Sequence, residues 1–141
     1  MAADDRVLMP VSGTIEYADM VAALMPLLRF HTKNITLFHV VETPVTTPLE
    51  SSELDKTLAG EETKLKPMAD WLTAQGYNVE TRIAVARHTV DAIVEETYAR
   101  GYSLIFMMKR RKRSLSEKLL GRSVTEEVIR RVKTPVVTIL V

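Results

Sequence analysis

The chain has 141 residues, of which 46% are hydrophobic and 26% charged, so composition and length predict one globular domain spanning residues 1–141. It contains no Cys, which excludes disulfides, thiolate zinc sites and cysteine nucleophiles and fits a reducing compartment. The net charge is +1, yet residues 109–113 are five consecutive cations, and without them 14 basic and 18 acidic residues remain.

Neither a secretion signal nor a membrane span is expected. The first five residues end in two aspartates and lack the charged-then-apolar pattern of a signal peptide. The best apolar run, Val136 to Val141, has the length of a strand, whereas a membrane helix needs about 20 residues. The sequence therefore predicts a soluble, cytoplasmic protein with no membrane partner.

The first half of the chain predicts two strands separated by a helix. Residues 6–11 form a short apolar run that ends at a Ser-Gly-Thr turn. Apolar residues then recur at helical spacing over residues 18–28, with Pro26 expected to kink that helix. Residues 35–41 are β-branched and aromatic, as in a buried strand.

A second helix and a third strand follow. Residues 47–50 read Thr-Pro-Leu-Glu, a capping box with Pro at the first helical position. The helix that it opens runs towards Gly76, and Gly60 and Pro67 are expected to split it. The third strand is expected over residues 77–84.

The next helix and strand complete the third unit. Thr89 is expected to cap a helix that ends at Gly101. Its predicted inward face carries Val90, Ile93, Val94, Thr97 and Tyr98. Residues 104–108 are entirely apolar and predict a fourth strand.

The C-terminal part repeats this pattern after a polar segment at residues 109–121. Residues 123–126 form a second capping box, and the inward face of its helix is expected to carry Val128, Ile129 and Val132. Thr134-Pro135 ends that helix, and residues 136–141 form the last strand. Alternating strands and helices predict an α/β fold, a parallel sheet with helices on both faces.

A ligand site can be placed in such a sheet without knowing the ligand. Ligands bind beyond the carboxyl ends of the strands, at the point where the strand order reverses. With the order 3-2-1-4-5, the reversal lies between the first and fourth strands. Residues 11–14 would then meet residues 108–111 and Ser123.

The sequence resembles the universal stress protein family over nearly its whole length. The resemblance rests on five segments in register: residues 7–14, 37–42, 103–107, 119–128 and 134–137. It implies a Rossmann-like five-stranded parallel sheet in the order 3-2-1-4-5. It also implies a homodimer paired through the last strand, at Val136, Val137, Thr138, Ile139 and Leu140.

Many members of that family bind ATP through a loop with the pattern Gly, two residues, Gly, nine residues, Gly, then Ser or Thr. Glycines there let backbone N–H groups approach phosphates at a helix N-terminus. This chain keeps only the third glycine, Gly121. Met108 and Arg111 replace the earlier two, and Arg122 precedes Ser123.

Other positions mark the same site. Ser12 stands where ATP-binding members carry Asp, whereas Val11 and Val40 match the family pattern. We therefore expect the usual ATP binding to be lost and the site to be eroded. The nucleotide- or anion-binding candidates are Val11, Ser12, Val40, Met108, Lys109, Arg111, Gly121, Arg122, Ser123 and Val124.

No catalytic or metal-binding pattern stands out. The three histidines, His31, His39 and His88, are scattered along the chain, and His39 is expected to be a hydrogen-bonded core residue. No Ser-His-Asp order and no pair of carboxylates stands out as a candidate for catalysis. It therefore predicts a binding protein with no metal and no enzymatic activity.

Three functions stay open. The first is a dimeric sensor or regulatory module of the universal stress type, which binds an anionic small molecule and does not hydrolyse ATP. The second is a nucleotide-binding protein for ATP or AMP, in which the basic segment 109–113 compensates for the missing glycines. The third is weak, salt-sensitive binding of nucleic acid or an acidic partner by that segment, which the acidic remainder of the chain disfavours.

Overall fold

The computed structural model describes residues 5–11, 18–22, 33–43, 52–109 and 124–141. The regular elements are β1 (Arg6–Pro10), β2 (Asn34–Glu42), α2 (Ser52–Ala74), β3 (Asn78–Ala86), α3 (Thr89–Arg100), β4 (Leu104–Lys109), α5 (Val124–Arg131) and β5 (Val136–Leu140). Residues 18–22 add a short helical segment. The capping boxes at residues 47–50 and 123–126 begin outside the described residues, so their caps are not tested.

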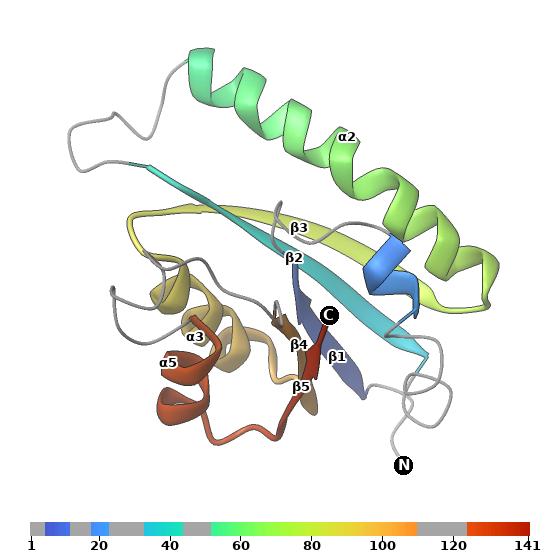
Figure 1. Ribbon diagram of the computed structural model, residues 1–141. Helices are drawn as coiled ribbons and strands as arrows, with labels where there is room; N and C mark the ends of the chain where they lie inside the picture. The colour runs from blue at the N-terminus through green and yellow to red at the C-terminus, as the bar shows by residue number, and fades with distance from the viewer. Residues whose placement is uncertain (1–4, 12–17, 23–32, 44–51, 110–123) are drawn as a thin grey trace.

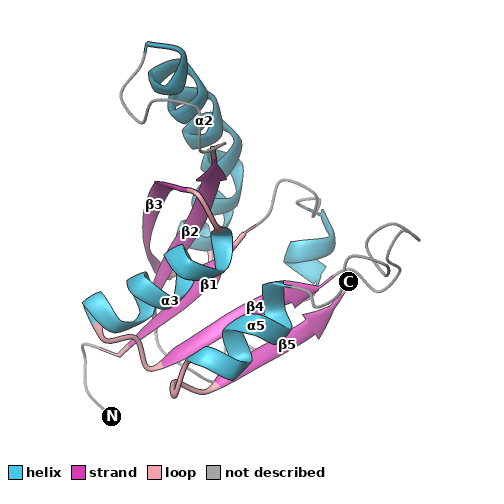
Figure 2. Cartoon of the chain, turned by 90° about the vertical axis from the view of Figure 1, so that its left-hand side faces the viewer, coloured by secondary structure: helices cyan, strands magenta, loops and turns pink. Residues whose placement is uncertain are grey.

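The five strands form one parallel sheet in the order β3-β2-β1-β4-β5. Helix α2 lies on one face of the sheet, and α3 and α5 lie on the other (Figure 1). Figure 2 shows the same three layers from the side. The predicted α/β fold, with its strand order and two-sided helix cover, is confirmed.

The period-two alternation of each strand divides the core into two layers. On the α2 face, Met9, Leu37 and Phe106 pack with the buried α2 residues Leu65 and Leu72. On the opposite face, a second layer is made by Leu8, Phe38, Ile105, Ile93 of α3 and Val128 of α5. Both strand faces are buried, which explains the near-continuous apolar strands of the sequence.

Helix α2 runs without interruption through Gly60 and Pro67, so the expected split is wrong. Its buried residues Leu54, Leu65, Met68 and Leu72 follow helical spacing across both positions. Burial of this stripe outweighs the helix-breaking tendency of the two residues. Within the described residues, no helix is long and apolar enough to cross a membrane.

Helix α3 differs from its prediction at its N-terminus. Its N-cap is His88, which makes no side-chain capping bond, and Thr89 is the first helical residue. The capping acceptor comes instead from β2, because the Thr89 N–H donates to Glu42 Oε1 at 2.7 Å. Gly101 ends the helix in the left-handed conformation, as predicted.

Two residues predicted to face inward are exposed. Tyr98 is 56% exposed and Ile129 is 49% exposed. The Tyr98 hydroxyl donates to Arg131 O and accepts from Lys133 N, so it links α3 to the end of α5 at the surface. Helix α5 is short and buries only Thr125 and Val128, which turns Ile129 away from the sheet.

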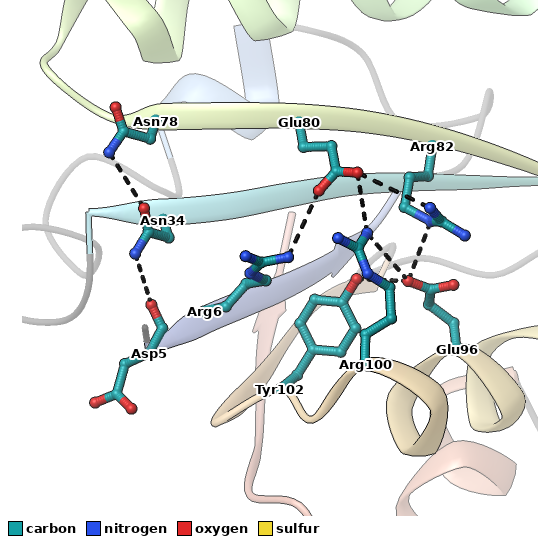
Figure 3. Close-up of polar contacts among 9 residues, drawn as sticks. All are labelled: Asp5, Arg6, Asn34, Asn78, Glu80, Arg82, Glu96, Arg100 and Tyr102. Carbon is teal, nitrogen blue, oxygen red and sulfur yellow. Dashed lines mark hydrogen bonds and ion pairs between the residues drawn. The ribbon is translucent and has the colours of Figure 1, made fainter. Parts of the chain in front are cut away.

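A cluster of charged residues joins β1, β3 and α3 near the amino ends of the strands (Figure 3). Glu96 is 7% exposed, accepts a hydrogen bond from the Tyr102 hydroxyl at 2.5 Å, and lies 3.2 Å from Arg82 Nε. Arg100 donates to Glu80 at 3.0 Å, and this bond lowers the pKa of Glu80. These bonds fix α3 against the sheet and thereby fix where its N-terminus lies.

Candidate functional site

The carboxyl ends of β1 and β4 lie at the reversal of strand order. The two strands pair at Val7↔Leu104 and Leu8↔Ile105, whereas β1 stays paired with β2 as far as Pro10↔Phe38. The pairing of β1 with β4 therefore stops earlier than its pairing with β2. This arrangement leaves room for a ligand between the strand ends, where open α/β sheets bind ligands.

A cavity of about 210 Å³ occupies this position. Its walls come from the ends of β1, β2 and β4 and from the first residues of α3 and α5. They are mostly apolar, with hydroxyls from Thr89 and Thr125 and the ring of His39 as polar groups. The full lining is Pro10, Val11, Phe38, His39, Val40, Thr89, Ile93, Met107, Met108, Val124 and Thr125.

The structure places four of the predicted site residues together around this cavity: Val11, Val40, Met108 and Val124. Ser12, Arg111, Gly121, Arg122 and Ser123 lie outside the described residues. Lys109 directly follows the lining residue Met108 and ends β4. Of the residues predicted to form a dimer interface, Val136, Val137, Thr138 and Ile139 are half-buried and Leu140 is exposed.

Sequence reasoning missed the remaining lining residues. Pro10 could have been found, because it directly precedes Val11 in a predicted strand, and Phe38 because it lies two residues before Val40 and therefore on the same face of its strand. Thr89 and Ile93 enter the site through α3, and their approach depends on how that helix packs. The sequence carries no signal for that packing beyond helical spacing.

His39 is held between the sheet and α2. Its Nδ1 lies 2.8 Å from Val11 O, and its Nε2 lies 3.1 Å from Glu61 Oε2. The ring therefore bridges the backbone at the end of β1 and the Glu61 carboxylate of α2 through its two nitrogens. The expected hydrogen-bonded role is confirmed, and the bond also fixes the Val11 carbonyl at the cavity.

Glu42 supports the opposite side of the cavity. As noted above, its carboxylate accepts from the N–H of the lining residue Thr89, at the N-terminus of α3. A carboxylate at a helix N-terminus is stabilised by the exposed N–H groups and the helix dipole. The end of β2 therefore positions the start of α3, and with it one wall of the site.

Lys109 and Glu126 form an ion pair beside the cavity, with 3.3 Å between Nζ and Oε1. Both side chains are partly exposed, at 25% and 45%. Glu126, the last residue of the predicted capping box at residues 123–126, thus pairs with the last residue of β4. Among the described residues, no three His, Asp or Glu side chains gather as a metal site requires.

Comparison with known proteins agrees with this architecture. The hypothetical protein MJ0577 shares 28% identity and a TM-score of 0.73, over 99% of this chain and 97% of that one. A universal stress protein from Archaeoglobus fulgidus in complex with dAMP shares 16% identity, with a TM-score of 0.68 and coverage of 97% and 98%. A universal stress protein in complex with cAMP shares 20% identity, with a TM-score of 0.68 and coverage of 96% and 95%.

No curated protein matches the sequence significantly. The two complexes are below 25% identity and therefore support the fold alone. The family model for universal stress proteins, in contrast, matches residues 5–139, nearly the whole chain. The chain belongs to the universal stress protein family.

Proposed function

We propose that this chain is a dimeric sensor or regulatory module that binds an adenine nucleotide or nucleoside without hydrolysing it. The observation that carries the proposal is the cavity at the reversal of strand order, walled by Pro10, Phe38 and Met107. Apolar walls suit the faces of a purine ring, and threonine hydroxyls with backbone groups suit its polar edges. Two proteins of the same fold form complexes with dAMP and with cAMP, so adenine ligands are the class to test first on this chain.

The size of the cavity favours binding of one part of such a ligand. At about 210 Å³ it is smaller than the roughly 300–1,000 Å³ of sites that enclose a whole drug-sized molecule. A base would fill it, and the sugar and phosphate would lie outside. The lining residues Val124 and Met108 stand on the side where Lys109 and Glu126 pair.

The polar groups of the site support binding and not hydrolysis. Among the described lining residues there is no carboxylate that could act as a general base. His39 uses both ring nitrogens in contacts with Val11 and Glu61. A site in which the histidine holds the Val11 backbone suits a module that reports ligand binding.

Blocking the cavity tests the ligand site. Val40→Phe adds a ring to the cavity wall, and we expect the affinity for adenosine and AMP to fall at least about tenfold, measured by isothermal titration calorimetry. Val41→Phe is the matched control, because Val41 is the next residue of β2 and points to the other face of the sheet. Wild-type affinity in a folded Val40→Phe variant would contradict the proposal.

The dimer part of the proposal rests on the difference between the two edges of the sheet. The β3 edge carries Glu80 and Arg82, and charges of this kind discourage pairing between strands of different molecules. The β5 edge, Val136–Leu140, has no charged side chain and leaves Leu140 51% exposed. Antiparallel pairing of two β5 strands in a twofold dimer would cover this edge.

Light scattering on the purified chain at micromolar concentration tests this part. We expect the mass of a dimer. An apolar edge strand that stayed uncovered would let further copies of the chain pair with it and aggregate. A monomer mass would contradict the dimer and would leave the ligand site to be judged by the cavity variants. No observation on the described residues favours nucleic-acid binding: Lys109 is paired with Glu126, and residues 110–113 lie outside the described part.

A further inference from the structure

Lys109 is held at the cavity by the sheet. Its backbone is the last of β4, pairs with Leu140 of β5, and accepts a hydrogen bond from Val141 N at 2.9 Å. Its side chain lies on the same face as Met107, two residues earlier, which is the face covered by α3 and α5. A cation is therefore fixed next to the cavity by the end of β4.

Glu126 meets this cation from the other side. It is the third residue of α5 and directly follows Thr125, which is 7% exposed and lines the cavity. The ion pair thus joins the end of β4 to the start of α5 alongside the cavity. Neither partner lines the cavity, but the residue before each of them does.

Lys109 is the cation beside the described lining that an anionic group of a ligand would meet. No Lys, Arg, Asp or Glu is among the lining residues, and His39 is already held by Val11 and Glu61. A phosphate that reaches Lys109 from a base in the cavity competes with the Glu126 carboxylate for that cation. The same carboxylate repels that phosphate directly.

We propose that the Lys109–Glu126 ion pair determines ligand specificity by disfavouring polyphosphates relative to adenine ligands of low charge. The inference rests on the proposed function, because it assigns the ligand class within the same site. The pair acts as an internal competitor: Glu126 takes the place of a phosphate on Lys109. Its effect is moderate, because ion pairs as exposed as this one shift equilibria by up to about fivefold.

Charge-neutral substitution of Glu126 tests this role. In Glu126→Gln we expect ATP affinity relative to adenosine affinity to rise about fivefold, measured by calorimetry at low ionic strength. Glu127→Gln is the matched control, because it removes the same charge from the same helical turn. In the double variant Lys109→Gln with Glu126→Gln the gain should vanish. An equal gain in both glutamate variants, or a gain that survives in the double variant, would overturn the inference.

A second probe separates this inference from the proposed function. If adenosine fails to bind the wild-type chain, the proposed function fails, and inorganic triphosphate then serves as the ligand for the same variants. We expect Glu126→Gln to bind it about fivefold more tightly than Glu127→Gln does. Equal binding, or no binding by any variant, would show that Glu126 does not control access of anions to Lys109.

Discussion

Glu96→Ala should lower the free energy of unfolding by about 3 kcal/mol, since it removes the buried centre of the charge cluster. Glu96 is 7% exposed and accepts a hydrogen bond from the Tyr102 hydroxyl. Its Oε2 lies 3.2 Å from Arg82 Nε and 3.8 Å from an Arg100 guanidinium nitrogen. Loss of the carboxylate leaves a buried hydroxyl without its acceptor. The two guanidinium groups are partly exposed, so water can compensate them in part.

Urea unfolding followed by the fluorescence of Trp71, the single tryptophan, measures this change. Glu95→Ala is the control, because Glu95 is the exposed neighbour on the same helix and its removal should cost less than about 0.5 kcal/mol. Similar stability of the two variants would show that the cluster does not hold α3 on the sheet.

The pH dependence of stability gives an independent check on the cluster. Burial raises the pKa of Tyr102 from 10.0 to about 12, and the bond to Glu96 adds to this rise. The neutral phenol is therefore favoured by folding: its contribution is complete below pH 10.0 and is lost as the pH rises towards 12. Tyr102→Phe should lose less stability than wild type over this interval.

Glu61→Ala should lower the free energy of unfolding by about 2 kcal/mol and also weaken ligand binding. The His39–Glu61 pair is mostly buried, with side chains 15% and 19% exposed, so the imidazole would lose an acceptor that water replaces poorly. His39 would then hold the Val11 carbonyl less firmly at the cavity. Calorimetry with adenosine and chemical unfolding measure the two effects.

Glu62→Ala is the matched control for Glu61→Ala, because Glu62 is the exposed neighbour of Glu61 on α2. It should change stability by no more than about 0.5 kcal/mol and leave adenosine affinity as in wild type. If Glu61→Ala lost stability but kept full affinity for adenosine, the His39–Glu61 pair would stabilise the fold without positioning Val11.

The fold could be predicted from the sequence because it depends on local patterns. Some strands, such as residues 35–41 and 104–108, are apolar along nearly their whole length. Each is followed by apolar residues at helical spacing and by a signal that ends the helix. This pattern already requires a parallel sheet with helices on both faces. The errors arose where tertiary burial overrides a local preference. Gly60 and Pro67 do not interrupt α2, because the buried stripe of that helix extends across both.

The position of the candidate site could also be predicted, but its polar contacts could not. The reversal of strand order placed Val11 and Met108 at the candidate site, whereas Val40 was named because it matches the universal stress protein pattern; all three line the cavity. The pairs that shape the site join distant residues: Glu42 caps Thr89, His39 meets Glu61, and Lys109 meets Glu126. Such pairs follow from how helices dock on the sheet, which no single segment of the sequence specifies.

A crystal structure of the chain grown with AMP tests the central claim most directly. We predict the adenine ring in the cavity between the ends of β1 and β4, in contact with Pro10, Thr89 and Met107, with the phosphate on the side of Lys109. AMP bound elsewhere on the molecule, with this cavity still filled only by solvent, would contradict the account.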